Sequence, residues 1–330
     1  MTHRPALSRS RPRTAFGASA AAPHAPRGRL LRTEAALLCV ALALLALACL
    51  GPVLPASLHQ HDFADARTLW GIPCAMDVLS NLPFAIAGLW GLLALRRVCQ
   101  GALDAASRGC AYLFFGGLIA TAAGSAVYHW APRDAGLVWD RLGMVLPFAG
   151  LLGLAAAGRV SERAGALAAA AVLLAGPLAV AWWARTGNLM PWAVVQIGGM
   201  LVVALLAVPA LFPLRRRGLA VHLGAVIGLY ALAKLFEAAD HSVLDATGWV
   251  SGHTLKHLAA AAAAWPVLLA VRSLGAAAPH GARTAHRGPT QTTVWGQNGA
   301  HNGVAGGLCT NQAVSERCGS GWATRRKTQQ

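Results

Sequence analysis

Two histidines four residues apart, His253 and His257, open the last of eight long apolar stretches of the chain. Ionisable residues are costly where a membrane helix begins, and those that occur there usually mark a functional site. Residues four apart lie on the same face of a helix, so both imidazoles can reach one metal ion. The segment Ser251-Gly-His-Thr-Leu-Lys-His257 is therefore a candidate metal-binding motif.

Two earlier apolar stretches also end or begin with polar residues of catalytic types. Ser125 and His129, in Gly124-Ser-Ala-Val-Tyr-His-Trp130, are four residues apart and share one helix face. Asp140 follows a short turn at residues 131–136, which returns the next helix beside the one before it. With the histidine pair, these positions predict one cluster at one end of a helix bundle: Ser125, His129, Asp140, His253 and His257.

This cluster has the composition of a catalytic zinc site. Three neutral imidazoles leave a fourth position open on zinc, and an open position distinguishes catalytic from structural sites. The metal would lower the pKa of a bound water towards about 7 and polarise a carbonyl. Asp140 could take the proton of the water and return it to the leaving group. Ser125 could donate a hydrogen bond to the water or to the developing oxyanion.

Each residue of the cluster also has a plainer interpretation when it is taken singly. A histidine at a helix end is commonly an interfacial residue. The Ser125 hydroxyl could bond a backbone carbonyl in helix packing. Asp140 could form an ion pair with its neighbour Arg141. The joint arrangement, rather than any one residue, indicates the metal site.

The composition predicts that the cluster lies in a membrane protein. Hydrophobic residues make up 56% of the chain and charged residues only 12%. A soluble core of this size would show amphipathic periodicity, whereas these segments are apolar nearly all round. Runs that can cross a hydrocarbon core of roughly 30 Å predict an all-α, polytopic membrane helix bundle. The eight runs are residues 34–54, 78–95, 110–129, 138–157, 165–183, 191–212, 219–236 and 253–271.

The arginines predict the orientation of this bundle, because the side with the excess of basic residues is usually cytoplasmic. We expect both termini in the cytoplasm and the histidine cluster near the extracytoplasmic face. The net charge of +16 then reflects topology, and no nucleic-acid partner is expected because the basic groups form no motif. Eight arginines lie in the expected cytoplasmic loops and three in the opposite loops: Arg96, Arg97, Arg108, Arg159, Arg163, Arg215, Arg216 and Arg217, against Arg67, Arg133 and Arg185.

Composition divides the chain into four regions. Residues 1–33 form a basic arm that is expected to be disordered and cytoplasmic. Residues 34–54 are an extra transmembrane helix; the alternative is a signal peptide, but the late start and the length favour a retained helix. Residues 58–272 hold the seven-helix domain, and residues 273–330 form a polar tail that is expected to be disordered and cytoplasmic.

The cysteines predict neither a disulfide framework nor a thiolate zinc site. None of them forms a CxxC pair, and several lie inside expected helices. The seven are Cys39, Cys49, Cys74, Cys99, Cys110, Cys309 and Cys318.

Several blocks within residues 58–272 are similar, in order, to a known group of membrane hydrolases. They are His61-Asp-Phe-Ala-Asp65, Asp77-Val-Leu-Ser-Asn-Leu-Pro-Phe84, Gly124-Ser-Ala-Val-Tyr-His-Trp-Ala-Pro132, Leu137-Val-Trp-Asp-Arg141, Leu229-Tyr-Ala-Leu-Ala-Lys-Leu-Phe-Glu237 with Asp240-His241, and Ser251-Gly-His-Thr-Leu-Lys-His257. These blocks resemble the bacterial branch of the alkaline ceramidase family. Adiponectin-receptor-like proteins share the Ser, His, Asp and HxxxH pattern but are less similar around Asn81 to Phe84.

The resemblance implies a zinc-dependent hydrolase of a bacterial inner membrane that cleaves a ceramide-like lipid amide. It implies that His129, His253 and His257 bind zinc, that Asp140 transfers protons and that Ser125 supports the water or the oxyanion. It also implies a seven-helix core built from the second to eighth apolar runs, with the first run as an added anchor.

The resemblance also bears on calcium. In the eukaryotic ceramidases, the segment before the first core helix holds calcium through acidic and carbonyl ligands. Here Cys74 stands where an acidic ligand would be expected, and Asp62 and Asp65 are only partial substitutes. A calcium site is therefore not expected.

Other function classes stay open on the sequence. The main alternative to the hydrolase is a non-catalytic membrane receptor or sensor whose zinc only ties two helices together. A metal transporter would need polar residues across the bundle, and the runs at 165–183 and 191–212 offer few. A further polar group either orients the zinc ligands or a substrate headgroup, or contains a Lys-Glu pair that offsets the cost of burial: Lys234, Glu237, Asp240 and His241.

Overall fold

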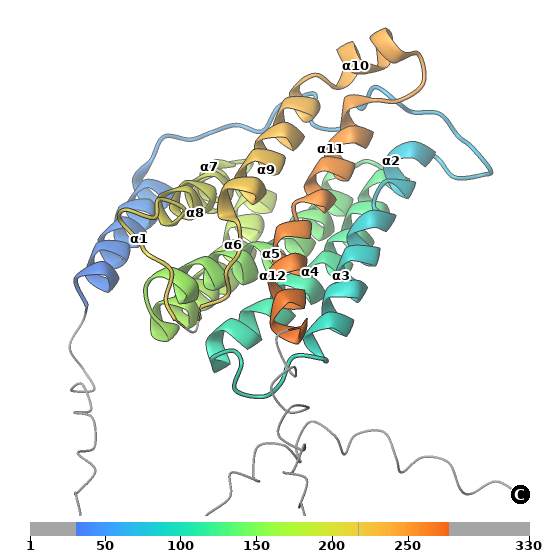
Figure 1. Ribbon diagram of the computed structural model, residues 1–330. Coiled ribbons are helices and arrows are strands. Elements are labelled where there is room, and N and C mark those ends of the chain that lie inside the picture. The colour runs from blue at the N-terminus through green and yellow to red at the C-terminus, as the bar shows by residue number, and fades with distance from the viewer. Residues whose placement is uncertain (1–30, 217, 277–330) are drawn as a thin grey trace, which may run out of the picture.

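The computed structural model describes residues 31–216 and 218–276, and this part of the chain consists of helices and loops without a strand (Figure 1). The predicted all-α class is thus confirmed. Most of the basic arm, Arg217, the polar tail from residue 277 and the cysteines Cys309 and Cys318 lie outside the described residues.

Eight helical segments correspond to the eight apolar runs, and three of them are divided. Six segments are long and apolar enough to cross a membrane, and Met190–Leu206 is a shorter apolar one, so the protein is a membrane helix bundle. The elements are α1 (Arg32–Leu50), α2 (Ala75–Leu79), α3 (Leu82–Leu95), α4 (Ala105–Trp130), α5 (Asp134–Arg159), α6 (Glu162–Thr186), α7 (Met190–Ala193), the π-helix η1 (Val194–Gly198), α8 (Gly199–Leu206), α9 (Leu223–Ala238), α10 (Asp240–Thr247), α11 (Gly252–Ala262) and α12 (Trp265–Ala276).

Proline explains where several helices begin, break or end. Pro83 and Pro266 stand in the first turns of α3 and α12, because a proline there removes no hydrogen bond that the helix needs. The run predicted to end at residue 212 leaves the helix at Leu206, shortly before Pro209, and the first run ends at Leu50 before Gly51 and Pro52. These two boundaries were therefore predicted too far along the chain.

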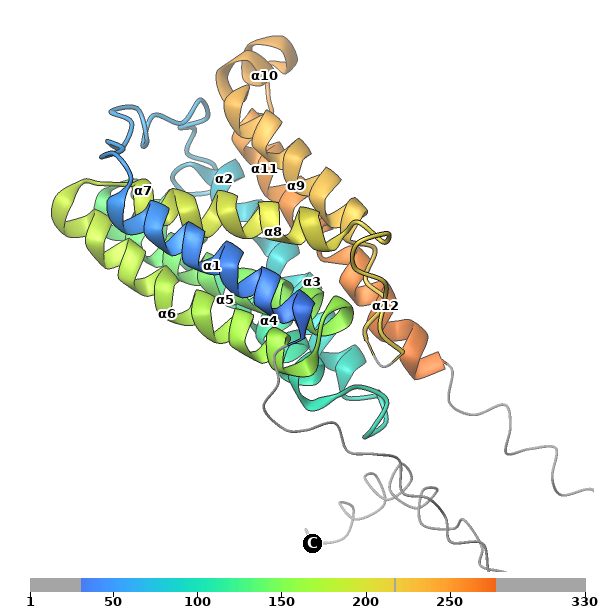
Figure 2. The same ribbon diagram turned by 90° about the vertical axis from the view of Figure 1, so that its left-hand side faces the viewer.

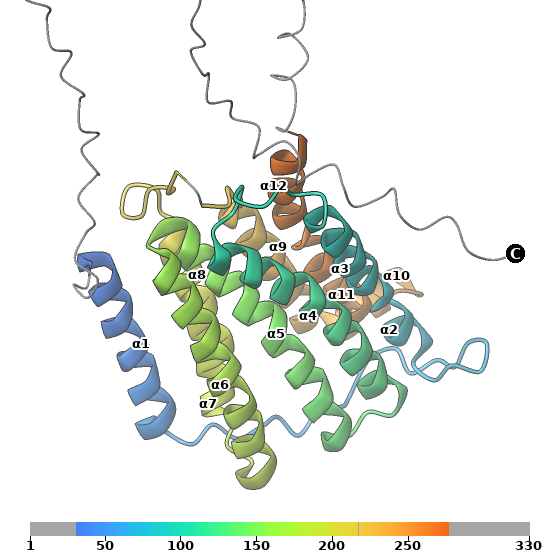
Figure 3. The same cartoon turned by 90° about the horizontal axis from the view of Figure 1, so that it is seen from below.

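The core of the bundle is built from neighbours in sequence, together with longer-range pairs such as α12 with α3. Helix α4 packs along α5, α5 along α6 and α3 along α4, while α9 lies against α11. Figure 3 looks along this arrangement from below, and Figure 1 shows α10 at the end opposite to the start of α1 and the end of α12. The eight segments thus leave the two ends of the described chain on one side of the bundle.

Helix α1 is peripheral. None of its residues is buried, and it touches the rest of the bundle mainly through α7 and η1, with one hydrogen bond from Ser161 to Glu34. Figure 2 shows it lying on the outside, in front of the bundle and between α6 and α8. Its exposed apolar surface is what a helix in contact with lipid requires.

A close approach of α4 and α5 sets the spacing at the end where the predicted cluster lies. A Cβ atom added to Gly124 would come within 2.4 Å of the backbone oxygen of Trp139, so only glycine allows this contact. One turn away, the Thr121 hydroxyl donates to the carbonyl of Gly143 across the same interface, at 3.1 Å. The neighbours Ser125 and Asp140 are thereby held opposite each other.

Candidate metal centre

The three predicted histidine ligands come together at one end of the bundle. His129 lies in the last turn of α4, and His253 and His257 lie in the first two turns of α11. One ligand atom from each residue lies within 4.8 Å of those of the other two, and all three side chains are buried. The predicted convergence of the three histidines is confirmed. The group could hold a metal ion.

The ring nitrogens fit a metal ion. Nδ1 of His129 is buried and has no hydrogen-bond partner among the described residues, a costly arrangement unless a ligand or an ion completes it. Nδ1 of His257 lies 2.7 Å from the hydroxyl of Ser80, which leaves Nε2 of that ring for another partner. Three imidazoles at these separations match the donor set of a zinc site.

Ser80 fixes the ring of His257. Its hydroxyl donates to the backbone carbonyl of Asp77 at 2.9 Å, so it acts as acceptor towards Nδ1 of His257. The Asp77 carboxylate in turn accepts a hydrogen bond from Thr254 at 2.7 Å, which joins α2 to α11. Partners of this kind orient metal-binding histidines and set the tautomer.

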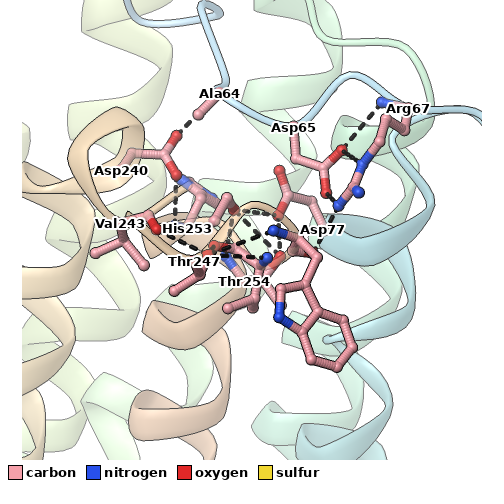
Figure 4. Close-up of polar contacts among 12 residues, drawn as sticks. Ala64, Asp65, Arg67, Asp77, Asp240, Val243, Thr247, His253 and Thr254 are labelled. Atoms are coloured by element: carbon pink, nitrogen blue, oxygen red, sulfur yellow. Dashed lines mark hydrogen bonds and ion pairs between the residues drawn. The ribbon is translucent and has the colours of Figure 1, made fainter. Parts of the chain in front are cut away.

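Asp240 fixes the position of His253. One carboxylate oxygen accepts the backbone N–H of His253 at 2.7 Å, and the other accepts that of Ala64 at 3.1 Å (Figure 4). Gly252 permits this contact, because a Cβ atom there would lie 2.3 Å from the carbonyl oxygen of Phe236. Asp240 thus satisfies a free N–H at the start of α11 and ties the loop before α2 to the site.

The Lys-Glu pair predicted on α9 exists and extends to the metal centre. Glu237 pairs with Lys234 and also with Lys256 of α11, the latter at 2.6 Å. The ammonium group of Lys256 lies 3.4 Å from Nε2 of His253. The pair therefore neutralises its own charges, as one of the two interpretations predicted, and Lys256 also brings it into contact with a histidine of the triad. His241 is exposed and has no such contact in the described structure.

A loop covers the histidines from outside. The ring of Phe63 packs against His129 and His253, with centroid distances of 4.6 and 4.5 Å. The hydroxyl of Tyr128 donates to the carbonyl of Gln60 at 2.9 Å and holds the loop on the end of α4. The loop thus limits the access of water to the triad.

The triad opens into a large cavity within the bundle. The cavity has a volume of about 960 Å³, at the upper end of the usual range for ligand pockets. One end is polar and includes the three histidines with Ser125 and Asp140. Apolar side chains line much of the remainder: Phe84, Phe114, Leu118, Met144, Phe148, Leu151, Met200 and Val226.

Ser125 and Asp140 are both in the predicted place. Ser125 is buried one turn before His129, and its hydroxyl lies close enough to the Asp140 carboxylate to interact with it. Both residues line the same cavity as the histidines. Asp140 forms no ion pair with Arg141 in the described structure, so the plain ion-pair interpretation of this aspartate is not what holds it.

The three residues considered for calcium do not form a calcium site in the described structure. Asp65 is buried and accepts two hydrogen bonds from the Arg67 guanidinium, at 2.8 and 2.7 Å, which hold the pKa of this carboxyl below its ordinary value. Asp62 is exposed beside His59. Burial raises the pKa of the Cys74 thiol, so this residue is a neutral and poor ligand for a hard cation.

Ser80, Phe63 and Lys256 contribute to the site but were not identified as site residues from the sequence. Ser80 had a usable signal, because a serine in the polar cluster at the head of an apolar run is costly unless it has a partner. Phe63 lies in a loop, and no sequence signal marked it as a site residue.

No family model matches the sequence, and no curated protein matches it.

Proposed function

We propose that this protein is a zinc-dependent integral membrane hydrolase that cleaves a lipid amide. The observation that carries the proposal is the buried triad of His129, His253 and His257 at the polar end of a cavity of about 960 Å³. A metal that only tied α4 to α11 would need no such cavity beside it. The cavity also brings Asp140 and Ser125 to the same end.

The cavity suits a substrate with one long hydrocarbon chain and one polar end. Its apolar part extends between α4, α5, α8 and α9 and would hold an acyl chain out of water. The polar part lies where α4 ends and α11 begins, which we place near the extracytoplasmic face. An acyl chain in the apolar part positions the bond to be cleaved beside the triad.

The histidines would hold the metal through neutral ring nitrogens, and imidazole ligands suit zinc. Bound there, zinc would supply a Lewis acid that acidifies water and polarises the amide carbonyl. Ser80 and Asp240 keep the ring of His257 and the backbone of His253 in place for this task. The loop at Phe63 keeps bulk water away from the reacting bond.

Asp140 is the base and acid of the proposed reaction. Its carboxylate takes a proton from the attacking water and delivers it to the amide nitrogen, whose bond to the acyl carbon breaks. The fatty acid and the free amine are the products. Ser125 orients this carboxylate from the facing helix or donates to the oxygen that becomes negative.

The blocks of sequence around these five residues support the same reaction class, because they resemble alkaline ceramidases. The ceramide-like amide of a sphingoid base is the substrate that this resemblance implies. A receptor or sensor of similar architecture is the alternative, and it would bind the lipid amide without cleaving it.

Replacement of Asp140 by asparagine tests the proposal. Purified wild type should release fatty acid from long-chain lipid amides, and Asp140→Asn should lower the rate by roughly 10²- to 10⁴-fold, the usual contribution of a general base. Asp140→Asn should keep its metal content, because Asp140 is not a member of the triad. Absence of hydrolysis by wild type across amides and esters would favour the sensor, and loss of metal in the variant would make Asp140 a ligand.

A further inference from the structure

Arg141 is a buried cation that lines the cavity without a hydrogen-bonding acceptor. The residue is only 7% exposed, and its Nη1 atom has no hydrogen-bond partner among the described residues. The guanidinium is charged at any physiological pH, so burying it without an acceptor is costly. A buried guanidinium without a hydrogen-bonding acceptor indicates that a ligand completes it.

The other charged groups of the cavity wall differ from Arg141 because each has a polar partner. Glu237 is shared by two lysines, and Asp240 accepts two backbone N–H groups. A carboxylate oxygen of Asp62 lies 3.6 Å from Nδ1 of His59, and the Ser125 hydroxyl lies beside the Asp140 carboxylate. Among the charged lining residues in the described part of the chain, Arg141 alone is without an acceptor.

Aromatic rings hold the guanidinium in a defined orientation. Its central carbon lies 3.8 Å from the ring centroid of Trp183 and 5.9 Å from that of Trp192. Stacking occupies a face of the planar group and leaves the N–H bonds along its edge free to donate. The edge of a stacked guanidinium matches the two oxygens of a carboxylate.

The position of Arg141 beside Asp140 limits where this anion can lie on a substrate. Both residues line the same cavity, and their charged groups are close enough to attract each other, so a group held by Arg141 is close to the atoms on which Asp140 acts. In an N-acyl amino acid, a single carbon separates the carboxylate from the amide nitrogen. A carboxylate on Arg141 therefore leaves the amide within reach of the proton-transfer residue.

We propose that Arg141 binds the carboxylate of an N-acyl amino acid, and that this class of anionic lipid amide is the substrate. The inference rests on the proposed amide hydrolysis and defines the group on the amide nitrogen. A single arginine matches the single charge of a carboxylate, whereas the neighbouring Asp140 carboxylate disfavours a doubly charged phosphate. Water adds to the acyl carbon, the C–N bond breaks, and the nitrogen takes the proton to give a fatty acid and an amino acid.

Two ligands that differ only at this group provide the test. N-Palmitoylglycine and N-palmitoylethanolamine share the acyl chain and the amide, but only the first has a carboxylate. In a His253→Ala background, which prevents turnover, N-palmitoylglycine should bind at least about tenfold more tightly, the difference expected for a charge-assisted pair. Arg141→Gln should abolish this difference and leave the affinity for the neutral amide within about twofold.

Arg159→Gln is the matched control, because Arg159 is on the same helix at its other end and donates to the Phe212 carbonyl at 3.1 Å. It should retain the preference for the carboxylate. Should Arg141→Gln fail to fold, Arg141→Lys keeps the charge without the planar fork and should lose most of the preference. Equal binding of both ligands by the parent protein, or a preference that survives in Arg141→Gln, would overturn the assignment.

Turnover by the protein with its histidines intact separates this inference from the proposed function. Faster cleavage of N-palmitoylglycine than of N-palmitoylethanolamine or a palmitoyl ceramide supports both. Selective binding of N-palmitoylglycine without cleavage would refute the hydrolase and support the proposed role of Arg141. Equal cleavage of anionic and neutral amides would support the proposed hydrolase and refute the proposed preference for a carboxylate. Tighter binding of N-palmitoyl-phosphoethanolamine than of N-palmitoylglycine would also refute it.

Discussion

The hydroxyl of Ser80 lies 2.7 Å from Nδ1 of His257 while it donates its own proton to the Asp77 carbonyl at 2.9 Å. A hydroxyl has one proton, so Nδ1 of His257 must be the donor in the first of these contacts. Nε2 then keeps the lone pair that a metal ion needs. Ser80, the residue that follows the short helix α2, thus sets the protonation of a histidine that is distant in the sequence.

Replacement of Ser80 by alanine should weaken metal binding. Loss of a hydrogen bond to a metal-binding histidine typically lowers affinity by about 10- to 100-fold, because the ring and its tautomer are no longer fixed. Competition with a chromophoric chelator measures the change. Ser107→Ala is the control, since Ser107 is also buried but lies at the start of α4, away from the triad. Wild-type affinity in Ser80→Ala would refute the role of Ser80.

Gly124→Ala should destabilise the bundle and separate Ser125 from Asp140. The new methyl group would lie 2.4 Å from the Trp139 oxygen, and overpacking of this kind costs about 1–3 kcal/mol. Thermal unfolding in detergent should show a lower melting temperature. Gly116→Ala, on the same helix, is the matched control because its Cβ would meet nothing within 4 Å. Equal melting temperatures for the two variants would contradict the close packing.

The helices of the bundle could be predicted from the sequence because apolar composition alone decides which segments cross a membrane. The ends of these helices were harder to predict. The run that was expected to continue to residue 212 stops at Leu206, since Pro209 and Pro213 act on the preceding backbone. The separation of α2 from α3 was also missed, although the polar residues Ser80 and Asn81 and then Pro83 stand at the break.

The triad could be predicted because histidines are rare at the ends of apolar helices and their spacing shows which of them share a face. The residues that orient the triad could not be predicted in this way. Ser80 meets His257 across 177 positions of sequence, and Phe63 reaches the triad from a loop. Such contacts depend on how α2 and the loop pack on α11, which no local pattern encodes.

The Asp65–Arg67 pair should make stability depend on pH. The folded pKa of Asp65 is lowered by the Arg67 guanidinium, so the folded state binds fewer protons here than the unfolded chain, whose aspartates titrate near about pH 4. The contribution is complete above about pH 5 and is lost as the pH falls through the folded pKa. Melting temperatures of wild type and Asp65→Asn should therefore differ at pH 7 and converge in acid.

Asp62→Asn is the control for this pair, because Asp62 is exposed and should change the melting temperature little at either pH. Added calcium should leave the wild-type melting temperature unchanged, since Arg67 already holds the Asp65 carboxylate. A difference between wild type and Asp65→Asn that grows in acid would refute the assigned pair.

Reporter fusions should place the metal centre near the extracytoplasmic face. Fusions after Arg97 should report the cytoplasm, because the arginine-rich loops are retained there. Fusions after Asp245, in the short helix α10 between α9 and α11, should report the opposite side. The reverse pattern would put the triad at the cytoplasmic face.

The zinc content of the purified protein tests the central claim most directly. Three buried histidines with one ligand atom each within 4.8 Å predict about one zinc ion per chain when the protein is prepared without chelator. Elemental analysis should find this stoichiometry in wild type, and it should find a loss of nearly all zinc in the His129→Ala, His253→Ala double variant. Undiminished metal in that variant, or a wild type that binds no zinc when zinc is supplied, would contradict the account.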